Sequence, residues 1–117
     1  MISSIQSALS GLQAFGTKLH ANANNVANSS TEGYKRTQVT LADQNPNGVR
    51  AVVRKSENAG PMVYTETNNG LELIEQSNVD ISNELPDMML NTNFYKANLR
   101  TLQAADELLG SVLDLKA

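Results

Sequence analysis

Apolar and small residues recur near the N-terminus at alternating steps of three and four positions. They lie at Ile2, Ile5, Leu9, Leu12, Gly16, Leu19, Ala23 and Val26. This is the spacing of a heptad seam on one face of a helix. Glycine is unfavourable inside a helix, so Gly16 indicates close approach of another backbone, with a neutral surface glycine as the alternative. The pattern predicts a long N-terminal helix that packs against a second helix.

The last part of the chain repeats the pattern and predicts a second, longer helix. Its seam positions are Ile81, Leu85, Met88, Thr92, Tyr95, Leu99, Leu102, Asp106, Leu109 and Leu113. Proline is tolerated only in the first turn of a helix. Because of Pro86, we expect this helix to start near Asn83 or to kink there. A helix from Asn83 to Leu115 is on the order of 50 Å long. The first helix cannot cover that length, so part of its stripe is expected to meet other chains; a plain antiparallel helical hairpin with ragged ends is the alternative.

The middle of the chain has the alternation of short strands. GVRAVVRK is rich in valine, and MVYTET and LELIEQ flank Asn68-Asn69-Gly70, which predicts a β-hairpin closed by a type I′ turn. Asn58–Pro61 ends the preceding strand, and Asp43–Gly48 is a loop. The predicted fold class is mainly α with a small β insert, in which the long terminal helices form an antiparallel coiled-coil pair. Residues 1–30 and 83–117 would form the helical domain, and 31–82 the turn and hairpin insert.

Composition argues against a large independent core. Aromatic residues make up 4% of the chain, and many of the hydrophobic residues are alanines, which bury little area each. Stability from partner chains is therefore expected. The net charge of −3 argues against nucleic acid as a partner. No run is long enough to insert directly into a membrane, and the first residues lack the features of a cleaved signal peptide.

Residues suited to chemistry are scarce. His20 is the only histidine, there is no cysteine, and the glycines are scattered rather than clustered before a helix. The carboxylate neighbours Glu72 and Glu75, like Asp106 and Glu107, are typical of solvated faces. We therefore expect no enzyme activity, no cofactor, no metal and no small-molecule substrate.

The stretch Asn22–Arg36, NANNVANSSTEGYKR, predicts a sharply defined helix end. Asparagine and serine compete with the backbone for hydrogen bonds inside helices and are favoured where helices end. Asn28 and Thr31 can satisfy orphan backbone groups. Gly33 can then adopt a left-handed conformation that reverses the chain and presents Tyr34 for packing.

These residues make the chain resemble the bacterial flagellar axial family of rod, hook and hook-associated proteins. The N-terminal family motif is matched by Ser10-Gly11-Leu12-Gln13-Ala14 and by the run Asn24–Arg36. The C-terminal motif is matched by Asn78-Val79-Asp80, Glu84, Met88, Tyr95, Ala97-Asn98 and Ala105–Gly110. The short insert is most similar to the proximal rod proteins, such as flagellar basal-body rod protein C.

The resemblance implies a structural subunit of the basal-body rod, which polymerises through its terminal helices into a torque-transmitting drive shaft. The implied partners are itself, other rod and axial proteins and the flagellar export apparatus. The implied location is the periplasmic rod, reached by export without a cleaved signal peptide. The alternative is a stand-alone coiled-coil adaptor, or a shortened axial paralogue, that binds a helical partner. The expected assembly residues are Leu12, Leu19, Asn24, Asn25, Val26, Asn28, Thr31, Gly33, Tyr34, Tyr95, Asn98, Leu99, Leu102, Leu109 and Leu113.

Overall fold

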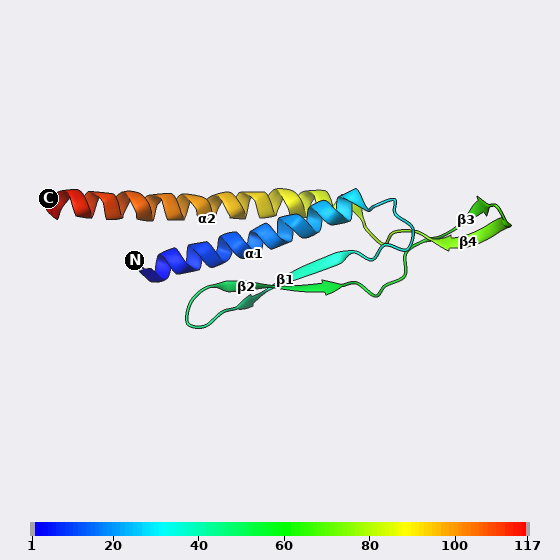
Figure 1. Cartoon of the computed structure of the whole chain (residues 1–117), viewed down its shortest axis with the longest axis horizontal. Coiled ribbons are helices and arrows are strands. Elements are labelled where there is room, and N and C mark those ends of the chain that lie inside the picture. Colours follow the sequence, from blue (N-terminus) through cyan, green and yellow to red (C-terminus); the bar gives the residue numbers. More distant parts are fainter. Residues whose placement is uncertain (1, 117) are drawn as a thin grey trace.

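The computed structural model describes residues 2–116 as an elongated molecule of two long helices with two hairpins between them (Figure 1). Its extents are 79 × 23 × 21 Å and its radius of gyration is 20.6 Å, against about 13 Å for a compact chain of this length. The elements in chain order are α1 (Ile2–Ala27), β1 (Thr37–Asp43), β2 (Val49–Lys55), β3 (Met62–Thr67), β4 (Gly70–Glu75) and α2 (Ile81–Lys116).

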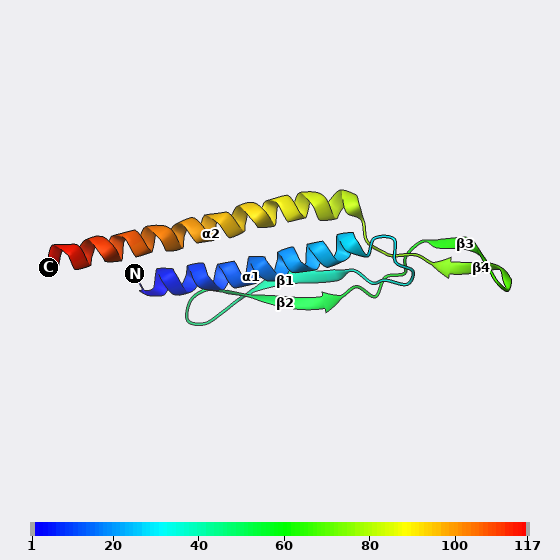
Figure 2. The same ribbon diagram turned by 45° about the horizontal axis from the view of Figure 1, so that its top comes forward.

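Helix α1 lies between α2 on one side and the β1–β2 hairpin on the other, and α2 runs antiparallel to it (Figures 1 and 2). This arrangement confirms the predicted fold class. Strand β1 was not predicted, although β2 and the loop before it were. Strands β1 and β2 pair antiparallel from Thr37↔Lys55 to Asp43↔Val49. The short, mixed sequence TQVTLAD carries a weak strand signal. Pairing with the valine-rich β2 provides the additional stabilisation that makes it a strand.

The core is thin and is built from small side chains. The buried hydrophobic residues are Ala8, Ala14, Ala21 and Ala105, and the largest fully buried side chains are Asn25 and Asn91. The rings of Phe15 and Phe94 stack with centroids 5.2 Å apart. Alanine buries little area, so contact between α1 and α2 provides limited hydrophobic stabilisation.

The buried face of each helix is displaced from the predicted seam. On α2 the residues facing α1 are Glu84, Asn91, Asn98 and Ala105, each one position from Leu85, Thr92, Leu99 and Asp106. The predicted partners Met88, Tyr95 and Leu102 are half-buried beside them. Within residues 2–116, the close helix approach predicted at Gly16 occurs at Gly11 instead. A Cβ at Gly16 would lie 3.8 Å from the Tyr95 ring, which is ordinary contact, whereas one at Gly11 would lie 2.5 Å from Oδ1 of Asn98.

Helix α2 begins at Ile81, slightly before the predicted start, and continues through Pro86. Asp80 caps it: its carboxylate accepts hydrogen bonds from the backbone and hydroxyl of Ser82, and its carbonyl accepts from the backbone of Asn83 and Glu84. Proline lacks the N–H that would bond the previous turn. The Asp80 cap fixes the helix start ahead of that position.

Strands β3 and β4 form the predicted hairpin, with Thr67 paired to Gly70 around Asn68-Asn69. The predicted type I′ turn was wrong. Such a turn needs positive φ at both central residues, but no non-glycine residue in the described chain has one, and Gly70 carries a φ of 110°. The glycine after the two asparagines therefore provides the left-handed conformation.

Candidate assembly site

The side chain of Asn25 joins four segments at the C-terminal end of α1. It is 1% exposed. Its Nδ2 donates to the carbonyl of Thr37 at 2.8 Å and to Oε1 of Glu84 at 3.1 Å. Its Oδ1 accepts from the backbone N–H of Thr37 at 2.8 Å and from the Tyr34 hydroxyl at 3.1 Å. Asn25 thus pairs with both backbone groups of Thr37, as a neighbouring strand would, and also bonds to Glu84 on α2.

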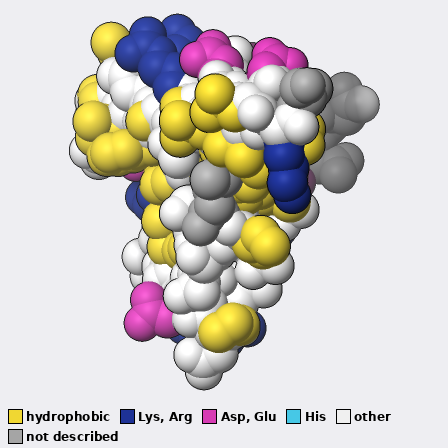
Figure 3. Space-filling view, turned by 90° about the vertical axis from the view of Figure 1, so that its left-hand side faces the viewer, with side chains coloured by type: hydrophobic (Ala, Val, Ile, Leu, Met, Phe, Trp, Pro, Cys, Tyr) yellow, Lys and Arg dark blue, Asp and Glu magenta, His cyan; other side chains and the backbone are white. Residues whose placement is uncertain are grey.

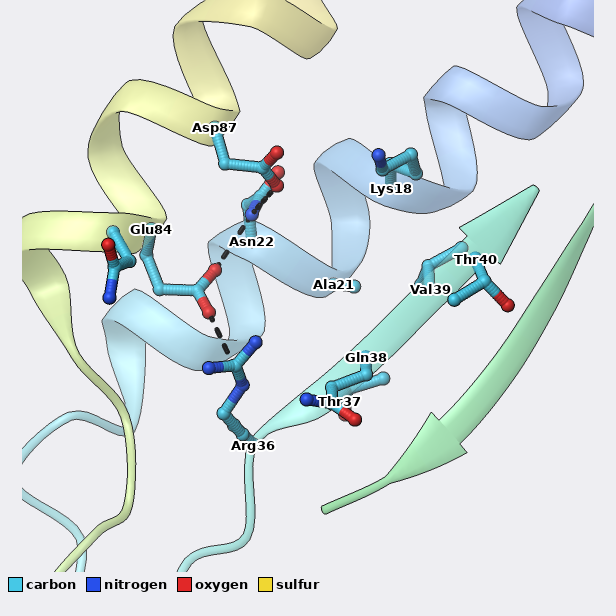
Figure 4. A pocket seen from close by; sticks show the side chains of 11 residues that line it. Lys18, Ala21, Asn22, Arg36, Thr37, Gln38, Val39, Thr40, Glu84 and Asp87 are labelled. Carbon is cyan, nitrogen blue, oxygen red and sulfur yellow. Dashed lines mark hydrogen bonds and ion pairs between the residues drawn. The ribbon is translucent and has the colours of Figure 1, made fainter.

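A cluster of polar side chains continues from Asn25 along the helix pair, and Figure 4 shows its members Asn22, Glu84 and Asp87. Asn22 donates from Nδ2 to Glu84 at 2.7 Å and to Asp87 at 3.0 Å. Its Oδ1 accepts from Asn91 at 2.8 Å, and Asn91 also donates to Asp87 at 3.1 Å. Because Asn22, Glu84 and Asn91 are buried, each partner that they lose would leave a costly unpaired group. The cluster therefore selects one register of α1 against α2.

Arg36, the residue before β1, lies beside Glu84 at one end of the cluster. Its Nε lies 4.0 Å from Oε1 of Glu84 and finds no hydrogen-bond acceptor among the described residues. Its backbone N–H donates to Oδ1 of Asn78 at 2.6 Å. A cleft of about 410 Å³ opens beside it, between α1, α2 and β1. Figure 4 shows Lys18, Asp87 and Thr40 along the walls of this cleft.

The turn after α1 has the predicted conformation. Asn28 donates from its side chain to the Asn24 carbonyl at 2.9 Å and accepts from the Thr31 hydroxyl at 3.1 Å. Gly33 has a φ of 66°, which confirms the left-handed prediction. Its N–H donates to the carbonyl of Glu75 at 2.9 Å. The turn is therefore tied to the end of β4.

We call the region where the end of α1, the turn to Tyr34, the start of β1 and the start of α2 meet the junction. Two carboxylates at this junction favour their charged form. The Lys35 ammonium, which bonds directly to Glu75, and the Gly60 N–H lower the pKa of the Glu75 carboxyl. The Ser82 hydroxyl and backbone N–H lower the pKa of Asp80. Both carboxylates are ionised at neutral pH, where one anchors the base of the β3–β4 hairpin and the other the start of α2.

Seven of the predicted seam residues follow the helix pair on the side next to its buried row. We call this side the open stripe and define it as Leu12, Gly16, Leu19, Ala23, Tyr95, Leu99 and Leu102. Gly16, Leu19, Ala23 and Tyr95 line a shallow groove with His20. Leu99 is 41% exposed, and Leu12 and Leu102 are half-buried. The buried row of alanines and asparagines lies beside this stripe.

Beyond the N-terminal end of α1, the last turns of α2 have no partner helix (Figure 1). Hydrophobic side chains gather on the end of the molecule that carries both termini (Figure 3). The exposed apolar residues in these turns are Leu108, Leu109, Val112, Leu113 and Leu115. An apolar helix surface of this kind is typical of an association site.

The structure separates the predicted assembly residues into three groups. The junction contains Asn25, Asn28, Thr31, Gly33 and Tyr34. The second group lies on the helix pair: Leu12, Leu19, Tyr95, Leu99 and Leu102 belong to the open stripe, Val26 is half-buried, and Asn98 faces α1 beside Gly11. Asn24 is solvent-exposed, and Leu109 and Leu113 lie on the unpartnered turns of α2.

Sequence reasoning missed the other half of the junction. Asn22, Arg36, Glu84 and Asn91 are all part of the polar cluster, and none was selected as a site residue. A signal was present, because Glu84, Asn91 and Asn98 follow one another at heptad spacing. Polar residues at a single heptad position are known to specify register.

Two protein-family models match this chain. The model described as "Flagella basal body rod protein" matches residues 5–35. The model described as "Flagellar basal body rod FlgEFG protein C-terminal" matches residues 72–115. Together they include most of both helices and most of the junction.

Two curated proteins are similar in sequence. The flagellar hook protein FlgE of Treponema pallidum (strain Nichols) is 30% identical over 93 residues, 80% of this chain and 20% of the hook protein. The flagellar basal-body rod protein FlgG of Bacillus subtilis (strain 168) is 44% identical over 43 residues, 37% of this chain and 16% of that protein. The matched regions thus span a fifth or less of these relatives' length.

The chain belongs to the rod and hook family of flagellar axial proteins. The two similar curated proteins are named as a flagellar hook protein and a flagellar basal-body rod protein. Over residues 2–116, neither helix has the length and apolar character needed to cross a membrane.

Proposed function

We propose that this chain is a subunit of the flagellar basal-body rod, where it polymerises with itself and with other axial proteins into the torque-transmitting shaft. The observation that carries the proposal is the open stripe. The large side chains of the stripe on α1 and α2 are only partly covered, while alanine and asparagine fill the space between the helices. A helix pair arranged in this way gains hydrophobic stabilisation when neighbouring helices cover its open side.

The junction has a second role in the proposal. Transmitting torque requires that the helices keep one register and one angle to the rest of the subunit. The polar cluster around Asn25 and Glu84 binds α1, β1 and α2 together. We propose that residues 1–30 and 83–117 form the axial domain and that 31–82 form its outer insert. The described helices, Ile2–Ala27 and Ile81–Lys116, suit this division.

The proposed location is the periplasmic rod, with the flagellar export apparatus as the delivery route. Support comes from the relative named as a basal-body rod protein and from the rod model that matches α1 and the turn. The relative named as a hook protein supports the hook as the alternative location.

The test is deletion of the gene in its own bacterium, with complementation and mass spectrometry of purified hook–basal bodies. The proposal predicts loss of motility and the presence of the chain in wild-type basal bodies. Leu102→Asp should fail to complement, because a carboxylate in a covered seam is unpaired. Gln103→Asp, one position away on the exposed side of α2, should complement. Normal motility after deletion, with a stable soluble complex between the chain and one helical partner, would support the adaptor alternative.

A further inference from the structure

The β3–β4 hairpin projects from the end of the molecule away from the helices (Figures 1 and 2). Apart from its own pairing, it packs against no helix or strand within residues 2–116. Its attachment is at the base, where the N–H of Gly33 bonds to the Glu75 carbonyl and Lys35 bonds to the Glu75 carboxylate. Isolated two-stranded hairpins are at best marginally stable in water. This hairpin has high β-propensity and no covering layer, so packing against the surface of another molecule would stabilise it.

One face of this hairpin is apolar and exposed. Directly paired residues share a face, and the register pairs Tyr64 with Leu73 and Glu66 with Leu71. The apolar residues on this face are Met62 at 52%, Tyr64 at 71%, Leu71 at 73% and Leu73 at 49% exposure. We call them the hairpin patch. Residues 62–75 contain three glutamates and no lysine or arginine, so the patch is apolar with an acidic edge at Glu66.

The outer face of the β1–β2 hairpin has the complementary charge. Val49, Arg50, Ala51 and Val53 line a groove against α1. Because side chains alternate along a strand, Val52 and Arg54 project to the opposite side, and Arg50, which shares their face by register, also borders the groove. Arg50 and Arg54 are exposed and have no ion-pair partner in the described part of the chain. Two unpaired guanidinium groups thus flank a valine.

We propose that the hairpin patch docks on the outer face of β1–β2 of a second copy of this chain, with Glu66 beside Arg50 and Arg54. The apolar surface on the last turns of α2 carries Asp106, Glu107 and Asp114 against the single Lys116, and this net negative charge would repel Glu66. The two docking surfaces differ from one another, so the contact is heterologous and adds copies in one direction. The inference goes beyond the proposed function, in which the helices carry assembly, and rests on it for the identity of the partner.

The first experiment uses the absence of cysteine from the native chain. Tyr64→Cys and Val52→Cys chains are purified separately, mixed and oxidised. The inference predicts an intermolecular disulfide between the two variants. Tyr64→Cys mixed with Glu107→Cys, on the acidic part of α2, should give only background cross-linking. Equal yields from both mixtures would overturn the inference.

The second experiment measures self-association by sedimentation velocity. Glu66→Lys should weaken it by about tenfold or more, because like charges would meet at the contact. The triple variant Glu66→Lys, Arg50→Glu and Arg54→Glu should recover most of that loss. Glu72→Lys is the matched control, since Glu72 pairs with Thr65 and lies on the opposite face of the hairpin. It should sediment as the native chain does, and circular dichroism checks that each variant is folded.

Unchanged association in Glu66→Lys would overturn the hairpin contact, as would a native chain that stays monomeric at every concentration tested. Neither result bears on whether the chain is present in hook–basal bodies. If the chain were absent from those particles yet the charge exchange held, the rod function would fail and the hairpin contact would stand.

Discussion

Each donor and acceptor of the Asn25 amide has a partner, in a side chain that is 1% exposed. An aspartate could not donate to Thr37 and Glu84, and an alanine would leave the Thr37 backbone and the Glu84 carboxylate short of partners. Asparagine is therefore dictated at this position by geometry as well as by size. Asn24, its exposed neighbour, faces none of these demands.

We predict that Asn25→Ala lowers the free energy of unfolding by about 2–3 kcal/mol, because it leaves buried polar groups unpaired. Asn24→Ala, the matched control, should change it by less than about 0.5 kcal/mol. Urea unfolding followed by circular dichroism measures both. Equal effects at the two positions would show that the polar cluster does not stabilise the fold.

Gly33 provides a second prediction at this scale. A Cβ at this position would meet nothing within 4 Å, so any penalty must come from the φ of 66°. Gly33→Val should destabilise by about 1–2 kcal/mol, because a branched side chain resists the left-handed region. Gly33→Asn should cost less, since asparagine tolerates that region. Thermal unfolding compares the two, and a valine variant as stable as the asparagine one would argue against conformational strain.

At the scale of the element, α2 depends on Asp80 for its start. Because hydrogen bonds from Ser82 lower the pKa of Asp80 in the folded chain, the cap stabilises the helix above the ordinary pKa of the carboxyl. That stabilisation is lost as the pH falls through the folded pKa. We predict that acidification frays the first turn of α2. Asp80→Asn, which keeps an acceptor but does not titrate, should remove this pH dependence.

Amide exchange or NMR shifts of Ser82–Glu84 over a pH series measure this fraying. The Asp80→Asn variant serves as the reference at each pH. A native chain whose first α2 turn stays as ordered as that of Asp80→Asn at every pH, including pH values below the lowered pKa of Asp80, would contradict the assigned role of the Asp80 carboxylate.

The two glycines of α1 distinguish the buried row from the open stripe. Gly16→Ala should raise stability by about 1 kcal/mol through helix propensity, since its Cβ would sit 3.8 Å from Tyr95. Gly11→Ala should show little or none of this gain. Its Cβ would displace the Asn98 side chain, which donates to the Phe94 carbonyl. Unfolding free energies of the two variants test this difference, and the opposite order would place the close helix contact at Gly16.

The helices, the second hairpin and the left-handed Gly33 were predictable because each has a local signal: period, turn residue or glycine. Which face of each helix packs against the other helix was not predictable. A seam prediction places the largest apolar residues between paired helices, but here Gly11 and Ala8 allow α1 to approach α2, and the leucines turn outward. In the proposed assembly, Leu12 and Leu99 belong to the stripe that another chain covers. The cluster of Asn22, Glu84 and Asn91 escaped prediction because it depends on contacts far apart in sequence.

At the scale of the whole molecule, the isolated chain is poorly covered. Its accessible surface is 8176 Å² for a mass of 12.6 kDa, against about 6,200 Å² for a compact monomer of that size. The excess reflects uncovered surface on the open stripe, on the last turns of α2 and on the projecting hairpin. Such a chain is expected to gain its order from neighbours.

Hydrogen exchange on a monomer verified by sedimentation, compared with the same chain in purified hook–basal bodies, tests this account most directly. In the monomer we predict fast exchange in the last turns of α2, about residues 107–116, with more protection near Asn22, Asn25 and Asn91. In the assembled structure, protection should extend along the whole of both helices. Strong protection of all of α2 in the monomer, unchanged on assembly, would mean that the helices need no covering subunits and would contradict the account.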